Sequence, residues 1–97
     1  MAAYGDTETQ TVGVLTAIQT ELKRLHLGMG GVVKMQVFLV GDPAYGGRMD
    51  FGGFMKGCTR FFGTPAQPLL PVRSAMQVAA LGNPGFLVEI EVTAVRP

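Results

Sequence analysis

Two β-like runs in the last quarter of the chain most constrain its fold. They read PVRSAMQVAAL and FLVEIEVTAV, and a short Gly-Asn-Pro-Gly segment separates them. Arg73 is the only charged residue between Arg60 and Glu89, and the only acids after Asp50 are Glu89 and Glu91. Burying a charge costs free energy, so a buried charge is usually paired or takes part in binding or catalysis. We therefore expect a hairpin that brings Arg73 and the glutamates into one shared site.

The segments before these runs predict a helix, a strand and a second helix. Apolar residues at steps of three or four predict a first helix over about residues 8–27, with Thr7-Glu8-Thr9-Gln10 as a capping box and Gly28 as the stop. The alternating segment VVKMQVFLV predicts a strand. Its clean apolar face is expected to hold four residues: Val33, Met35, Val37 and Leu39.

The second helix is expected to begin after Asp50 as N-cap and to continue to Gly63. Its apolar residues keep helical spacing: Phe51, Phe54, Met55, Cys58, Phe61 and Phe62. Gly52, Gly53 and Gly57 lie inside it, and each costs roughly 1 kcal/mol relative to alanine. We therefore expect this helix to depend on packing or on the close approach of a neighbouring element.

The order helix, strand, helix, strand, strand predicts an α+β fold, with two helices on one face of a small mixed sheet. The first strand, the second helix and the strand over residues 72–81 form a βαβ unit, and residues 86–95 complete an antiparallel hairpin. One set on the last strand is expected to face the helices: Phe86, Val88, Ile90, Val92 and Ala94. The opposite set, expected to point away from the helices, is Leu87, Glu89, Glu91, Thr93 and Val95. By the same alternation on the preceding strand, Arg73, Ala75, Gln77 and Ala79 are grouped together on that face. A bulge at Val72 would move Arg73 to the other face.

Composition narrows the class of protein. At 97 residues we expect one domain, and 47% apolar against 15% charged residues favours self-association that hides apolar surface. Eight scattered Lys and Arg with a net charge of +1 give no nucleic-acid footprint. The single Cys58 and single His26 have no metal-ligand spacing, so we expect neither metal nor cofactor. Without a signal peptide or an apolar run of about 18 residues, a cytoplasmic protein that does not enter membranes is expected.

Several segments together resemble the Rid family, the YjgF-like reactive-intermediate deaminases. They are GDTETQT, VVKMQVFLV, a Phe-Phe-Gly helix end, PVRSAMQVAAL and VEIEVTAV, and the resemblance covers about residues 5–96. It implies a chorismate-mutase-like α+β fold. It also implies a homotrimer whose sheets face inward, with three sites at the interfaces between subunits.

The resemblance implies hydrolysis of reactive 2-enamine and 2-imine acids to 2-keto acids and ammonia, as in a 2-iminobutanoate/2-iminopropanoate deaminase. By position, Arg73 matches the arginine that grips the substrate carboxylate, and Glu89 matches the acid proposed to position the attacking water. Ala75 replaces a substrate-site residue that is often cysteine. A guanidinium can donate two parallel hydrogen bonds to a carboxylate, and a partly buried glutamate suits proton transfer to and from water.

Several alternative interpretations of this sequence stay open. Family members usually begin with two or three further strands that contribute a pocket tyrosine, so this single domain of residues 1–97 is expected to be a shortened member. The same fold could be a non-catalytic module that binds a small carboxylate or keto acid, and Arg73 could serve only in an assembly ion pair with Glu89 or Glu91. A truncated reading of a longer gene is a further alternative. A ribonuclease or translation inhibitor ranks last, because the charge distribution gives it little support.

Overall fold

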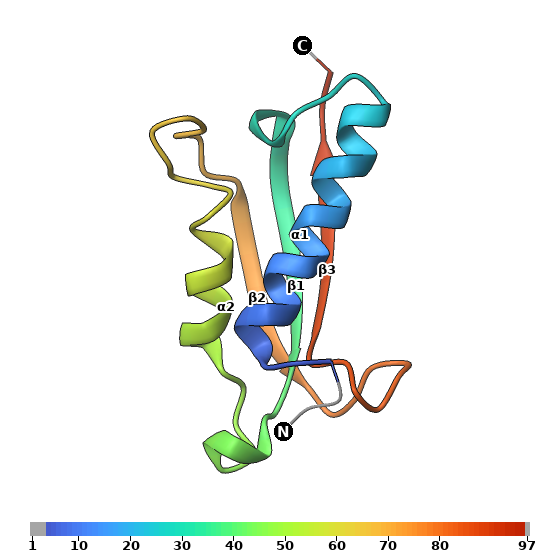
Figure 1. The fold of residues 1–97 in the computed structure, drawn as a ribbon, viewed down its shortest axis with the longest axis vertical. Helices are drawn as coiled ribbons and strands as arrows, with labels where there is room; N and C mark the ends of the chain where they lie inside the picture. Colours follow the sequence, from blue (N-terminus) through green and yellow to red (C-terminus); the bar gives the residue numbers. More distant parts are fainter. Residues whose placement is uncertain (1–3, 97) are drawn as a thin grey trace.

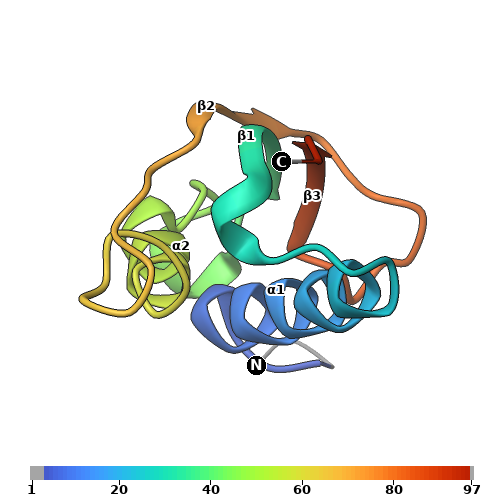
Figure 2. The ribbon, with the colours of Figure 1, turned by 90° about the horizontal axis from the view of Figure 1, so that it is seen from above.

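Two helices cover one face of a three-stranded mixed sheet, as Figures 1 and 2 show in views at a right angle. The computed structural model describes residues 4–96. The elements are α1 (Thr7–Arg24), β1 (Val32–Val40), α2 (Phe51–Cys58), β2 (Val72–Val78) and β3 (Val88–Ala94), with 3-10 turns η1 (Met29–Gly31) and η2 (Pro43–Tyr45). This arrangement confirms the predicted α+β fold and its α-β-α-β-β order.

The central strand of the sheet is β1, because the strand order is β2-β1-β3. It pairs in parallel with β2, as the βαβ unit predicts, and antiparallel with β3. The predicted hairpin between β2 and β3 is therefore wrong. Since β2 ends at Val78 and β3 begins at Val88, residues 79–87 form a connection longer than expected. That segment can easily cross two strand spacings of about 4.8 Å each.

Hydrogen bonds at its first turn tie α1 to the rest of the fold. Asp6 is the N-cap and accepts from the Thr9 amide at 2.8 Å, so the capping box predicted at Thr7 is wrong. Hydrogen bonds from the backbone and side chain of Thr9 lower the pKa of Asp6. Gln10 instead turns to the loop before β3, where its Oε1 accepts from the Leu87 amide at 2.7 Å and its Nε2 donates to the Gly85 carbonyl at 3.1 Å.

The C-terminus of α1 is a Schellman motif and not a glycine stop. The Leu27 amide donates to the Leu22 carbonyl at 2.7 Å, and the His26 amide donates to the Lys23 carbonyl at 3.0 Å. His26 takes the left-handed conformation, with φ of 61°. The helix consequently ends before the predicted position, and Gly28 lies beyond it.

The helix-facing side of β1 is confirmed except at the strand's start. Met35, Val37 and Leu39 are all buried. Val32 is only 4% exposed and Val33 is 41% exposed, the reverse of the prediction. A register shift between Val32 and Lys34 causes this exchange, because one irregular residue reverses the alternation before it.

On β3, the predicted division of faces holds within the strand and fails before it. Val88 is buried, and Glu89 and Glu91 are exposed, as predicted. Leu87 is buried and Phe86 is exposed, although the alternation predicted the opposite. Both residues precede the first paired residue of β3, so the strand's alternation does not extend to them.

The second helix begins at the predicted N-cap, since the Asp50 side chain accepts from the Gly53 amide at 2.9 Å. It ends at Cys58, earlier than predicted, and turns carry the chain to the buried Phe62. Close approach of α1 confirms the expected role for one of the three glycines, Gly57. A Cβ on Gly57 would lie 2.8 Å from Thr11 Cγ2 and 3.1 Å from the Glu8 carbonyl oxygen.

Gly57→Ala should therefore lower the free energy of unfolding by about 1–3 kcal/mol, because Thr11 is buried and the Glu8 backbone cannot move away cheaply. Gly52→Ala is the matched control in the same helix, since its nearest neighbour outside the local backbone is Asp50 Oδ1 at 3.9 Å. The control should be stabilising by up to about 1 kcal/mol. Urea unfolding followed by circular dichroism measures both, and equal effects would contradict the close-approach explanation.

Candidate functional site

Arg73 lies on the helix-covered face of the sheet. It is the register partner of Met35 in the parallel β1–β2 pair, and Ala75 is the partner of Val37. Paired residues on adjacent strands point to the same face, so Arg73 and Ala75 lie on the same side as the core. The predicted grouping of these residues is correct within β2, but the face to which it was assigned is wrong.

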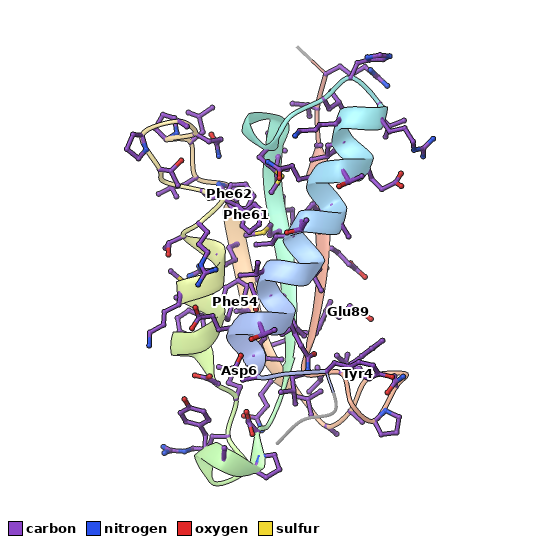
Figure 3. The ribbon with its side chains drawn as sticks, in the orientation of Figure 1. Tyr4, Asp6, Phe54, Phe61, Phe62 and Glu89 are labelled. Atoms are coloured by element: carbon purple, nitrogen blue, oxygen red, sulfur yellow. The ribbon has the colours of Figure 1, made fainter. Side chains whose placement is uncertain are left out.

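Glu89 and Glu91 lie on the opposite face. They are the register partners of Phe38 and Gln36, which alternate with the buried residues of β1. In Figure 3, Glu89 lies beside β3 and far from α2, whereas Phe54 lies between α2 and the sheet. With β1 also separating the two strands, the shared site predicted within one chain is wrong. Within residues 4–96, Arg73 forms no ion pair with Glu89 or Glu91, and the alternative of an ion pair between copies stays a prediction.

Side chains of α2 hold the Arg73 guanidinium. Its Cζ lies 5.2 Å from the centroid of the Phe51 ring and 5.6 Å from that of Phe54, and its Nη1 lies 2.8 Å from Met55 Sδ. Positions i, i+3 and i+4 place these three side chains on one helical face. A cation over two aromatic faces is attracted by about 0.5–1 kcal/mol per ring at an exposed site. The contacts orient the planar group without neutralising it.

The contact of these aromatic residues with Arg73 was not predicted. Their helical spacing indicates only packing against the sheet, which is right for the fully buried Phe54. Phe51 is 37% exposed and contacts Arg73 instead. No sequence signal separates the two roles, because a residue at either position lies on the stripe that faces the sheet.

A cavity of about 340 Å³ lies beside Arg73, between α2, the start of β2 and the segment before it. Its buried lining consists of Met35, Cys58 and Phe62, and its more exposed lining includes Leu70. Arg73 is the one charged residue among those that line it. Within residues 4–96, the ion pairs are Arg24–Glu21 and Arg60–Glu8, so Arg73 has no acidic partner there. Such a cavity is suited to a small anion with an apolar part.

The Cys58 thiol is buried in the wall of this cavity. Burial raises its pKa, and the nearby Arg73 guanidinium offsets part of that rise. The protonated thiol is therefore the dominant form at neutral pH, where it is a poor nucleophile. Cys58 thus acts as a small apolar residue, in agreement with its place among the apolar residues of the predicted second helix.

Among residues 4–96, no three His, Cys, Asp or Glu side chains are grouped so that they could hold a metal ion. Neither helix in that range has the length and apolar character needed to cross a membrane.

A protein-family model described as Endoribonuclease L-PSP matches residues 1–96 of the chain. Among solved structures, E. coli TdcF with bound serine is 29% identical, with a TM-score of 0.79 over 96% of this chain and 67% of that one. A member of the YjgF/YER057c/UK114 family from Mycobacterium tuberculosis is 29% identical, with a TM-score of 0.73 over 92% and 67% of the two chains. No curated protein matches the sequence significantly.

A third structure, named as a translation initiation inhibitor from Vibrio vulnificus, is 32% identical. Its TM-score is 0.78, and the match covers 95% of this chain and 67% of that one. All three similarities extend over nearly the whole chain. The fold and the arrangement of strands described above are therefore those of this group of structures.

Alkylation of Cys58 tests the electrostatics of the cavity. Iodoacetamide should modify the folded protein with a pH midpoint above the ordinary value of 9.0, because burial disfavours the thiolate. In Arg73→Gln the midpoint should move higher still, since the neighbouring positive charge is removed. Cys58 is the only cysteine, so mass spectrometry reports it alone. A midpoint below 9.0, or one that falls in Arg73→Gln, would contradict this description.

Proposed function

The chain belongs to the endoribonuclease L-PSP family, which includes the YjgF-type proteins, and we propose that it hydrolyses small 2-imino and 2-enamine acids to 2-keto acids and ammonia. The observation that carries the proposal is an oriented guanidinium, without an acidic partner in residues 4–96, at an apolar cavity. Arg73 would hold the substrate carboxylate through two parallel hydrogen bonds. E. coli TdcF contains bound serine, an acid whose carboxylate is attached to a nitrogen-bearing carbon, as in a 2-imino acid.

The proposed reaction adds water to the carbon of the C=N bond and then releases ammonia. Holding the carboxylate fixes that carbon relative to the cavity, which is the positioning part of catalysis. Ala75 lies two residues from Arg73 on the same face and packs against the core, outside the residues that line the cavity. The water must still exchange protons with an acid or base.

Glu89 is proposed for that proton transfer, and this role requires a second copy of the chain. It is exposed on the open face of its own sheet, whereas Arg73 faces the helices. In a homo-oligomer, proposed here to be a trimer, Glu89 of one copy would approach Arg73 of the next. Contact between copies would also provide the burial that favours proton transfer by a carboxylate.

One observation favours a second candidate function, a non-catalytic module that binds small carboxylates or keto acids. No acidic side chain lines the Arg73 cavity in the described part of the chain, so that part supplies an anion-binding group without a proton-transfer partner. Binding needs only Arg73 and the apolar lining. RNA cleavage, to which the family's name refers, has less support because the Lys and Arg residues are few and scattered.

Turnover tests the first proposal. The purified protein should accelerate decay of the imine released by a threonine dehydratase, and Arg73→Ala should lower kcat/KM about 10- to 100-fold through loss of a charged hydrogen-bonding group. Glu89→Gln should lower kcat, whereas the matched variant Glu91→Gln should not. Decay at the uncatalysed rate, even at high protein concentration, would rule out the deaminase.

Calorimetry separates the second candidate from the first. Titration with 2-oxobutanoate should release heat in the unsubstituted protein and none in Arg73→Ala, because the carboxylate loses its bidentate partner. If this binding occurs and turnover is absent from both proteins, the chain is a binding module. Binding that survives Arg73→Ala would contradict both functions at this cavity.

A further inference from the structure

We propose that the cavity beside Arg73 selects monoanionic 2-imino and 2-keto acids with a branched apolar side chain, such as the 4-methyl-2-oxopentanoate skeleton, over shorter acids and over dicarboxylates. This selectivity rests on the proposed function, because it takes Arg73 as the group that holds the carboxylate. It concerns the part of the cavity that Arg73 does not occupy.

The cavity has one cation that can anchor a carboxylate. The Cζ of Arg73 lies 5.2 Å and 5.6 Å from the centroids of the Phe51 and Phe54 rings, and one of its nitrogens contacts Met55 Sδ. Arginine has five N–H donors in a planar fork, so donors remain for one carboxylate. No second cation lines the cavity in the described part of the chain. A second carboxylate would lose water there without gaining a partner, which disfavours dicarboxylates.

Most of the remaining lining is apolar and rich in sulfur. Met35, Cys58 and Phe62 are buried, and Thr59 contributes the one hydroxyl group among the lining side chains. Methionine side chains are flexible and polarisable, and they adapt to ligands of irregular shape. The volume of about 340 Å³ lies at the small end of ligand sites, which suits a compact branched group.

Leu70 provides an apolar surface that a longer ligand would cover. It lines the cavity, yet its own surface is 76% exposed. Each methylene that a ligand buries strengthens binding by about fourfold. The two additional carbons of 4-methyl-2-oxopentanoate, compared with 2-oxobutanoate, should therefore give about 15-fold tighter binding.

The test is calorimetric titration with 2-oxobutanoate, 4-methyl-2-oxopentanoate and 2-oxoglutarate. We expect the branched acid to bind about 15-fold more tightly than 2-oxobutanoate, and 2-oxoglutarate to bind most weakly. Leu70→Ser should weaken binding of the branched acid several-fold and leave 2-oxobutanoate nearly unchanged. Leu69→Ser is the matched control, because Leu69 is also exposed but does not line this cavity. It should change neither affinity.

The outcomes distinguish failure of this selectivity from failure of the proposed function on which it rests. If all three acids bind with equal affinity and Arg73→Ala abolishes the binding, the selectivity is wrong while carboxylate binding by Arg73 stands. Tighter binding of 2-oxoglutarate would also overturn the selectivity. If no acid binds, or if Arg73→Ala binds all of them unchanged, both the selectivity and the proposed function fail.

Discussion

Backbone hydrogen bonds on both edges of β1 organise the molecule. One edge pairs in parallel with β2 and the other antiparallel with β3, and one face of β1 supplies the buried Met35, Val37 and Leu39. Since paired residues share a face, this strand decides which side chains of β2 and β3 reach the helices. It places Arg73 toward α2 and Glu89 toward the open face. The chemical character of each face follows from this pairing.

The contact between the helices depends on the absence of a side chain. Gly57 lets α2 approach Thr11 and the Glu8 backbone of α1 more closely than any residue with a Cβ would allow. The Arg60–Glu8 ion pair, at 2.8 Å, crosses the same region. Gln10 anchors the other side of α1 to the start of β3. The helices are thus held by short-range contacts, and α2 is positioned to present Phe51, Phe54 and Met55 to Arg73.

The two faces of the sheet differ in the charges and apolar side chains that they carry. The helix-covered face has one cation, held over aromatic rings and without an acid from residues 4–96. The open face combines exposed Val72 and Met76 with the two glutamates of β3. An apolar face with a few charges is suited to contact with another protein surface, so the expected self-association remains a prediction. If an acid takes part in chemistry at Arg73, contact between copies is the means of combining the two faces.

Local patterns in the sequence were sufficient for the elements and the fold class. Helical spacing predicted both helices, Asp50 was identified as an N-cap, and alternation identified the buried side of β1. These features depend on residues close in sequence, whose geometry is set by the periods of helix and strand. The motifs PVRSAMQVAAL and VEIEVTAV near the C-terminus also resembled those of the family to which the chain belongs. The ends of α1 and the start of β1 were less predictable, because a Schellman turn at His26 and an irregularity near Val33 replace regular geometry.

By itself, the sequence determined which segments are helix or strand, which family the chain belongs to, and that Arg73 and Glu89 are the unusual charges of its last quarter. Only the tertiary structure decided that these two residues face away from each other. Apolar residues occur on both sides of β2, with Ala75 on one side and Val72 and Met76 on the other, so alternation alone cannot orient that strand. Its orientation comes from hydrogen bonding in register with β1, a contact between segments far apart in the chain that no local period encodes.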